Sequence, residues 1–219
     1  MKVRIIPRTL QFKEPAGTSR GVYHMRKVWY IVLTYQEQGT SAFGIGECAP
    51  LYDLSAEYNE DYEMRLSQFC KDFEHTKSID GLKDIDAFPS IRFGLETALL
   101  SAEASLKGDY LQLFDTPFSR GEVGIPINGL IWMGDKEAML QRLEKKVAEG
   151  FRCIKLKIGA IDFNDEVALI EHLRSRFPKE QMTIRVDANG GFSYEEAMKA
   201  LPRLQPLDIH SIEQPIKAR

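Results

Sequence analysis

The second half of the chain contains three short polar motifs, each after an apolar stretch: Lys155-Leu156-Lys157, Asp187-Ala188-Asn189 and Glu213-Gln214-Pro215. Lys157 lies 30 residues before Asp187, and Asp187 lies 26 residues before Glu213. Each interval is about the length of one strand–helix unit of a parallel barrel. Catalytic residues of such barrels lie at the carboxyl ends of the strands, which meet at one edge. The spacing therefore predicts a base and two carboxylates side by side.

The two carboxylates, Asp187 and Glu213, are candidate ligands for a divalent cation. Mg²⁺ takes oxygen ligands in near-octahedral geometry, and neighbouring strand ends can supply two of them. Taken singly, each acid is more often an exposed loop residue. Their equivalent positions in consecutive units favour a metal site instead.

Lys155 and Lys157 share one face of the predicted strand, because side chains alternate with a period of two. Taken alone, the pair is more often a solvated strand edge. Two lysines inside a barrel are costly unless carboxylates compensate them, and Asp187 and Glu213 can do so. The proximity of two like charges predicts a lowered pKa for each lysine, which suits a general base near neutral pH.

The first part of the 219-residue chain reads as antiparallel strands followed by helices. Residues 28–35 and 41–47 are predicted strands, and residues 14–21, with a proline and two glycines, are a predicted flexible loop. Apolar residues at helical spacing from Ile91 predict a helix that Ser90 caps and Gly108 ends.

After a Pro/Gly-containing link at residues 115–121, strands alternate with helices. The predicted strands are residues 123–131, 151–158, 182–186 and 209–212. Helices are predicted between them, with Asp135 as one cap and a Ser193–Glu196 capping box at the start of the last. Such alternation predicts parallel pairing with right-handed crossovers.

The composition excludes several classes of protein. A net charge of −3 gives no basic surface for nucleic acid, and no apolar run reaches transmembrane length. Charge and a proline interrupt the first seven residues too early for a signal peptide. The three cysteines are widely spaced without metal-ligand or redox spacing, which favours a reduced, cytoplasmic protein.

The three motifs resemble those of the enolase superfamily, in its muconate-lactonizing-like branch. Within that branch, residues 46–51, 127–131 and 185–191 are similar to the o-succinylbenzoate synthase family of menaquinone synthesis. The resemblance implies an α/β fold in which an α+β capping domain, residues 1–120, precedes a (β/α) barrel of TIM type. Residues 121–219 would hold the first four barrel strands, and four strands cannot close a barrel. The sequence therefore predicts a longer natural protein, with a third carboxylate ligand and a second lysine beyond residue 219.

The resemblance also implies roles for individual residues. Lys157 would remove a proton α to a carboxylate, and Lys155 would tune and orient it. Asp187 and Glu213 would bind Mg²⁺, with Mn²⁺ as a substitute, and so stabilise the developing enediolate. Arg185 shares the face of Asp187 and resembles the arginine of the synthases; an ion pair with an acid on a neighbouring strand is its alternative.

Three further residues have weaker assignments. Asn189 belongs to its motif and supports the turn after the strand. Residues 16–21 and 49–58 match two capping-domain loops that close over substrate, in which Arg20 and Tyr52 are candidate contacts. For either residue alone, an ordinary exposed position is the more frequent outcome.

The function implied is a metal-dependent lyase that dehydrates a small cyclohexadiene carboxylate. One alternative is a dipeptide epimerase or N-acylamino-acid racemase of the same superfamily. Another, from a different class, is a non-catalytic fragment or binding module. The sequence leaves open whether the protein forms a homo-oligomer.

Overall fold

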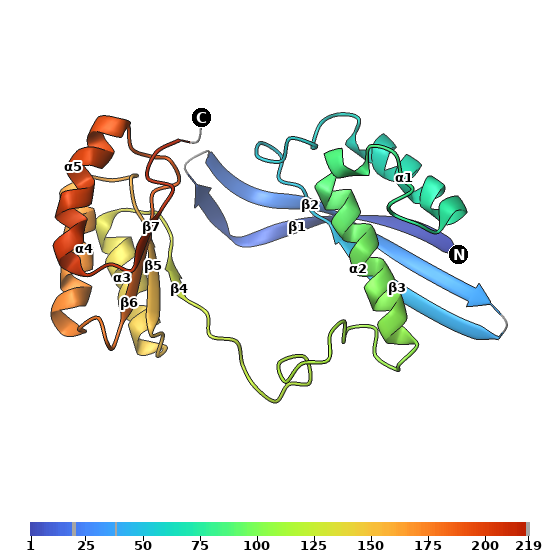
Figure 1. Ribbon diagram of the computed structural model, residues 1–219. Coiled ribbons are helices and arrows are strands. Elements are labelled where there is room, and N and C mark those ends of the chain that lie inside the picture. Colours follow the sequence, from blue (N-terminus) through green and yellow to red (C-terminus); the bar gives the residue numbers. More distant parts are fainter. Residues whose placement is uncertain (19–20, 38, 218–219) are drawn as a thin grey trace. The chain divides into compact units, whose positions relative to one another are not determined.

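The computed structural model describes residues 1–18, 21–37 and 39–217 of the chain. It divides into two compact units, the first formed by Met1–Glu14 and His24–Gly124 and the second by Pro15–Tyr23 and Ile125–Arg219. Figure 1 labels the helices and strands of both, and each unit is described by itself.

A three-stranded sheet with the order β1-β2-β3 forms the N-terminal part: β1 (Lys2–Thr18), β2 (Gly21–Glu37) and β3 (Thr40–Cys48). β2 and β3 pair antiparallel, with Ile31 opposite Gly46. The loop predicted for residues 14–21 is wrong for residues 14–18, which belong to β1, and for Gly21, which begins β2; residues 19 and 20 lie outside the described residues. β1 is an edge strand of the sheet, the kind of strand in which a proline such as Pro15 is tolerated.

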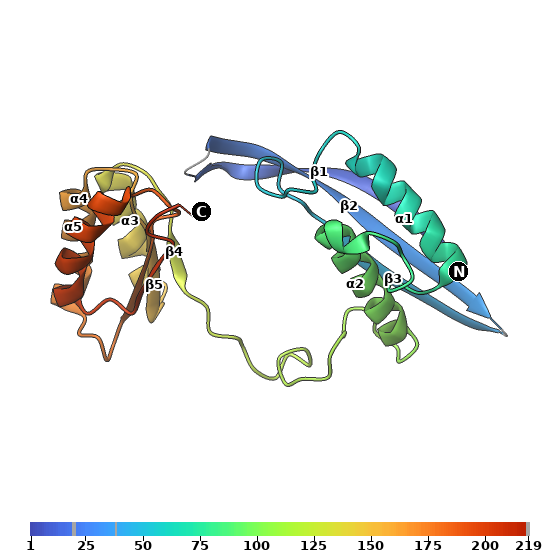
Figure 2. The same ribbon diagram turned by 45° about the horizontal axis from the view of Figure 1, so that its top comes forward.

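Two helices bury one face of this sheet: α1 (Tyr62–Thr76) and α2 (Pro89–Ser105), with the short η1 (Ile85–Ala87) between them. Both helices lie along the same face of the sheet (Figure 2). Their apolar residues form one core with alternate residues of β2 and β3, among them Trp29 and Ile31. Phe88, and not the predicted Ser90, occupies the N-cap position of α2. Pro89 begins the helix without needing a hydrogen-bond partner, and the Ser90 hydroxyl lies 2.6 Å from that of Tyr62.

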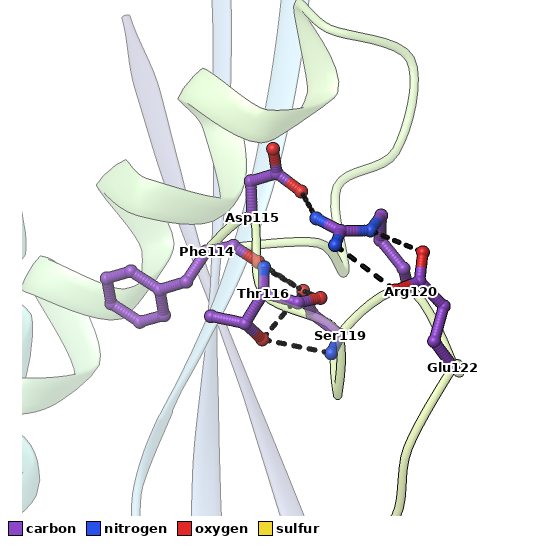
Figure 3. Close-up of polar contacts among 6 residues, drawn as sticks. All are labelled: Phe114, Asp115, Thr116, Ser119, Arg120 and Glu122. Carbon is purple, nitrogen blue, oxygen red and sulfur yellow. Dashed lines mark hydrogen bonds and ion pairs between the residues drawn. The ribbon is translucent and has the colours of Figure 1, made fainter.

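The segment between α2 and β4 contains a turn that is held by its own side chains (Figure 3). Ser119 Oγ accepts a 2.9 Å hydrogen bond from the Thr116 N–H, and Arg120 pairs with Asp115 and Glu122. The ring of Phe114 points away from these contacts and is exposed. The predicted link at residues 115–121 is therefore irregular in structure but ordered by local polar contacts.

The second unit contains a parallel sheet with the order β4-β5-β6-β7. Its strands are β4 (Gly129–Ile131), β5 (Cys153–Lys157), β6 (Thr183–Asp187) and β7 (Ser211–Glu213). Helices α3 (Lys136–Ala148), α4 (Phe163–Arg176) and α5 (Tyr194–Leu204) alternate with them, and the short η2 (Gln205–Leu207) follows α5. The strand predicted for residues 123–131 is wrong for residues 123–128, which lie outside β4.

Helices α3, α4 and α5 cover one face of this sheet (Figures 1 and 2). Ile154 and Leu156 of β5 and Ile184 and Val186 of β6 point into their shared core. The predicted Asp135 cap and the Ser193–Glu196 capping box are both confirmed. The architecture is the predicted α/β fold, with strand–helix units ordered as the first four of a barrel.

Candidate active site

The candidate site lies on the sheet face opposite the helices, at the carboxyl ends of β5, β6 and β7. The strand register places Lys157 beside Asp187, and Asp187 beside Glu213. Lys155 lies beside Arg185 in the row below. Since side chains alternate along each strand, these five residues share one face while their neighbours enter the core. The three sequence motifs are thus adjacent, as their spacing predicts.

Lys157 contacts two residues of the neighbouring motif. Its Nζ lies 2.7 Å from Asp187 Oδ2 and 2.7 Å from Asn189 Oδ1. Asp187 is fully buried, so its charge depends on these lysine contacts for compensation. The arrangement fixes the direction of the Lys157 side chain through two acceptors.

Lys155 bridges the two carboxylates. Its Nζ lies 3.0 Å from Asp187 Oδ2 and 2.6 Å from Glu213 Oε2. One cationic nitrogen therefore contacts both acids at once. Carboxylate oxygens are the ligands that Mg²⁺ prefers, so this donor pair fits a divalent cation in its chemistry and its proximity. Among the described residues, no group of three or more His, Cys, Asp or Glu side chains could hold a metal ion.

The charges around Lys155 and Asp187 determine the direction of their pKa shifts. Burial acts to lower the pKa of Lys155, but hydrogen bonds to Glu213 and Asp187 outweigh it and raise that pKa above its ordinary value. The predicted lowering is therefore wrong for Lys155, because its contacts with the two carboxylates outweigh the effect of burial. Burial likewise acts to raise the pKa of Asp187, and hydrogen bonds from Lys157 and Lys155 hold it below its ordinary value.

Arg185 extends from β6 on the same face and is exposed. Within the described part of the chain, its guanidinium forms no ion pair or side-chain hydrogen bond. Among the described residues, no acid on a neighbouring strand pairs with Arg185, which was the alternative expected from the sequence. A free guanidinium at this position has five donors available for an anionic ligand.

The backbone turns sharply after β6 and β7. Asn189 has φ +48° and Gln214 has φ +41°, both in the left-handed region. Asn tolerates this region well, and the Asn189 N–H donates a 3.0 Å hydrogen bond to Asp187 Oδ1. The Gln214 carbonyl accepts a 2.7 Å hydrogen bond from the Gly190 N–H. These bonds tie the turn carrying Asn189 to the residue that follows Glu213.

The two predicted substrate-loop residues lie apart from this cluster in the chain. Tyr52 is 79% exposed, and its ring meets that of Tyr58 edge-on at 6.0 Å. It helps to line a cavity of about 520 Å³ with Tyr58, Asn59 and Glu60. Arg20 lies outside the described residues. The substrate contacts of both residues stay predictions.

Glu166 of α4 also contributes to this region, although the sequence analysis did not single it out. It is 1% exposed, and its Oε1 accepts hydrogen bonds from the N–H groups of Gly159, Ala160 and Ile161. This loop directly follows the strand that carries Lys157. A signal was present, since Glu166 shares the helical spacing of the buried Ile170 and Leu173. An acid on an apolar helix face points to a buried partner.

Comparison with known families gives a match for each half of the chain. Residues 138–219 match the family described as "Enolase C-terminal domain-like". Residues 20–102 match the family described as "MenC, N-terminal domain". The match described as an N-terminal domain thus precedes the one described as a C-terminal domain along the chain.

Individual relatives agree with these families. An o-succinylbenzoate synthase from Desulfotalea psychrophila is 40% identical over 240 residues, covering 95% of this chain and 63% of that protein. The crystal structure of MenC from the same organism has a TM-score of 0.73 at 33% identity and covers 99% of this chain and 64% of its own. An L-Ala-D/L-Glu epimerase from Bacillus subtilis is 25% identical over 218 residues, covering 96% of this chain and 57% of that protein.

A third structure is similar in fold. It is an o-succinylbenzoate synthase from Thermosynechococcus elongatus complexed with magnesium in the active site, with a TM-score of 0.75 at 23% identity over 99% of this chain and 62% of its own. The chain therefore spans less than two thirds of the length of these relatives.

Proposed function

We propose, from the premise that the chain belongs to the enolase superfamily, that the full-length protein is a divalent-metal-dependent lyase. Its reaction would remove a proton α to a carboxylate and then release water, converting a cyclohexadiene carboxylate to o-succinylbenzoate. The observation that carries this proposal is the pairing of two lysines with two carboxylates at the ends of three neighbouring strands. The relative at 40% identity supports the choice of substrate.

Lys157 would act as the base. Asp187 Oδ2 and Asn189 Oδ1 hold its Nζ from two sides, which limits the directions from which a substrate proton can approach. After proton transfer, the same ammonium can donate its proton to the leaving hydroxyl, so one residue would serve both steps. Lys155 would contribute charge beside it, and the exposed Arg185 would bind the substrate carboxylate.

Asp187 and Glu213 would hold the metal, together with a ligand from outside these residues. When bound, the cation supplies positive charge that offsets the charge developing on the substrate carboxylate. Lys155 now contacts both acids, so its ammonium would have to withdraw from at least one of them. We propose Mg²⁺ as the cation and Mn²⁺ as a substitute with the same preference for oxygen ligands.

A dipeptide epimerase is the second candidate. The observation that favours it is the 25% identity to the L-Ala-D/L-Glu epimerase over 96% of the chain. The two reactions share the first step, removal of a proton α to a carbonyl group. They differ in whether water leaves or a proton returns to the opposite face.

One assay distinguishes the candidates. The purified full-length protein with Mg²⁺ is incubated in D₂O with the cyclohexadiene substrate or with a dipeptide panel that includes L-Ala-L-Glu. Formation of o-succinylbenzoate, read by mass spectrometry, with little deuterium entering the dipeptides supports the lyase. Deuterium at a dipeptide α-carbon without dehydration would establish the epimerase. If neither product forms, the non-catalytic alternative is favoured.

We also propose that the protein is cytoplasmic. All three cysteines are free, and Cys48 and Cys70 are buried, which suits a reducing cytoplasm. Among the described residues, no helix has the length and apolar content needed to cross a membrane. A small carboxylate is the proposed substrate, and nucleic acid is not a proposed partner. Light scattering on the full-length protein would test for a homo-oligomer.

A further inference from the structure

We propose that Glu166 is a positioning residue that clamps the loop after β5 and so holds Lys157 in place for proton transfer. The catalytic part of this inference rests on the role proposed for Lys157. The clamp itself rests on the hydrogen bonds and burial of Glu166.

The first observation is the concentration of hydrogen bonds on one oxygen. Glu166 Oε1 lies 2.7 Å from the Gly159 nitrogen, 3.1 Å from that of Ala160 and 3.4 Å from that of Ile161. Three successive N–H groups of a loop thus converge on one carboxylate oxygen. Hydrogen bonds to a buried charged group are among the stronger ones, and each N–H would lose its partner if the carboxyl were removed.

The second observation is the cost of having this acid at a core position. Glu166 is 1% exposed, and its other oxygen, Oε2, is buried without a hydrogen-bond partner among the described residues. A side chain that served only to fill space here would be more stable if it were apolar. A carboxyl at this buried position therefore indicates that the three N–H groups require an acceptor.

The third observation connects this loop to the catalytic cluster. The loop begins two residues after Lys157, and Gly159 turns it with φ +84°. It packs closely against the turn after β6, because a Cβ on Gly191 would lie 3.0 Å from the Gly159 carbonyl oxygen. That second turn carries Asn189, whose Oδ1 accepts from Lys157.

The contacts continue to the third strand of the site. Gly190, in the same turn as Asn189, donates a hydrogen bond to the Gln214 carbonyl beside Glu213. The Ile158 N–H donates one of 2.9 Å to the Asp187 carbonyl. Fixing the loop at residues 159–161 therefore restrains the ends of β5 and β6, and through the Gly190 bond the end of β7.

Two variants of the full-length protein separate the acceptor from the volume it fills. Glu166→Gln keeps an oxygen that can accept from the three N–H groups, whereas Glu166→Leu keeps apolar bulk and removes the acceptor. Glu171→Leu is the matched control, because Glu171 is an exposed acid on the same helix. Hydrogen–deuterium exchange of residues 159–161 reports on the clamp, and kcat and KM for dehydration report on positioning.

We expect Glu166→Leu to speed exchange at residues 159–161 and to lower kcat by roughly 10- to 100-fold while KM changes little, since small misplacements of catalytic groups act on the chemical step. Glu166→Gln should retain protection and most of kcat, and Glu171→Leu should match wild type in both. Unchanged exchange in Glu166→Leu would overturn the clamp. Faster exchange with unchanged kcat would overturn the link to Lys157.

The exchange measurement is independent of the proposed function. If wild type has no dehydratase activity, the proposed function and the catalytic part of this inference both fail. The exchange of residues 159–161 in the two variants then still decides whether Glu166 is the clamp.

Discussion

At the scale of single residues, two side chains of the site accept hydrogen bonds from the lysines and also take part in the turn after β6. Asp187 accepts from both lysines through Oδ2 and from the Asn189 backbone through Oδ1. Asn189 accepts from Lys157 while its own backbone takes a left-handed conformation. Under the proposed function, changes at these positions would affect both catalysis and backbone conformation, and suitable pairs of variants can separate the two effects.

Asn189 offers such a pair. Asn189→Ala and Asn189→Gly both remove the oxygen that orients Lys157, and both should lower kcat by about 10- to 100-fold through misplacement of the base. Only alanine has a Cβ that conflicts with φ +48°, so Asn189→Ala should be less stable than Asn189→Gly by about 1 kcal/mol. Urea unfolding and steady-state kinetics on the same samples check this. Equal stability of the two variants would contradict the conformational argument.

Glu166 predicts a dependence of stability on pH. Burial raises the pKa of Glu166, more than its three backbone hydrogen bonds lower it, and the charge of Asp162 adds to the increase. A carboxyl with a raised folded-state pKa contributes stability at acid pH that is lost as pH rises through that pKa. The Glu166→Gln variant does not titrate, so it should gain stability relative to wild type as pH rises from the ordinary glutamate value of about 4.3.

The measurement is urea unfolding of wild type and Glu166→Gln at several pH values. Glu171→Gln, which changes an exposed acid on the same helix, is the control and should track wild type. A difference between wild type and Glu166→Gln that stays constant with pH would show that Glu166 does not titrate abnormally.

At the scale of elements, close backbone packing decides how α2 lies on the first sheet. A Cβ on Gly46 would lie 1.8 Å from the Gly94 carbonyl oxygen, and one on Gly44 would lie 2.0 Å from that of Ala98. Both obstacles are backbone atoms of α2, which cannot move without the whole helix. These two glycines thus set the distance between helix and sheet.

Gly46→Ala should therefore destabilise the protein by about 3 kcal/mol, at the upper end of the usual cost of overpacking a core. Gly124→Ala is the matched control, because an added Cβ there meets no atom within 4 Å and its φ is not positive. Thermal unfolding followed by circular dichroism compares the two. A Gly46→Ala variant as stable as Gly124→Ala would show that α2 shifts at little cost.

The sequence predicted the elements of the second unit better than those of the first. Strand–helix units, the Asp135 cap and the Ser193 capping box rest on local patterns that tertiary contacts do not override. The extension of β1 through Pro15 was not predictable, because an edge position depends on which strands pair. The prediction of a lowered pKa for Lys155 was wrong for a similar reason. The direction of that shift depends on how closely Asp187 and Glu213, which are distant in sequence, approach the Lys155 ammonium.

At the scale of the whole molecule, the described residues form two separate cores, and the candidate catalytic and metal-binding residues belong to the unit that holds the second core. Lys155, Lys157, Asp187 and Glu213 belong to the second unit, together with the core that supports their strands. Tyr52 belongs to the first unit. The proposed chemistry therefore lies in the second unit, and the substrate contact of Tyr52 in the first unit stays a prediction.

Metal binding should stabilise the full-length protein, because a ligand that binds only the folded state raises the free energy of unfolding. The gain is about 2.7 kcal/mol when free Mg²⁺ is roughly one hundred times its Kd. Glu213→Gln should lose most of this gain. Because the Glu213 side chain is exposed, the substitution should have little effect on folding. Thermal unfolding with Mg²⁺ or with EDTA measures the difference. An equal Mg²⁺ shift in wild type and Glu213→Gln would remove Glu213 from the metal site.

The most direct test of Lys157 as the base compares the dehydration rate of the full-length wild type with that of Lys157→Ala in the presence of Mg²⁺. Loss of the general base predicts a fall in kcat of about 10²- to 10⁴-fold. Circular dichroism and the Mg²⁺ shift in thermal unfolding should stay close to wild type, because β5 and the carboxylates remain. A Lys157→Ala enzyme that forms o-succinylbenzoate at nearly the wild-type rate would show that Lys157 is not the general base.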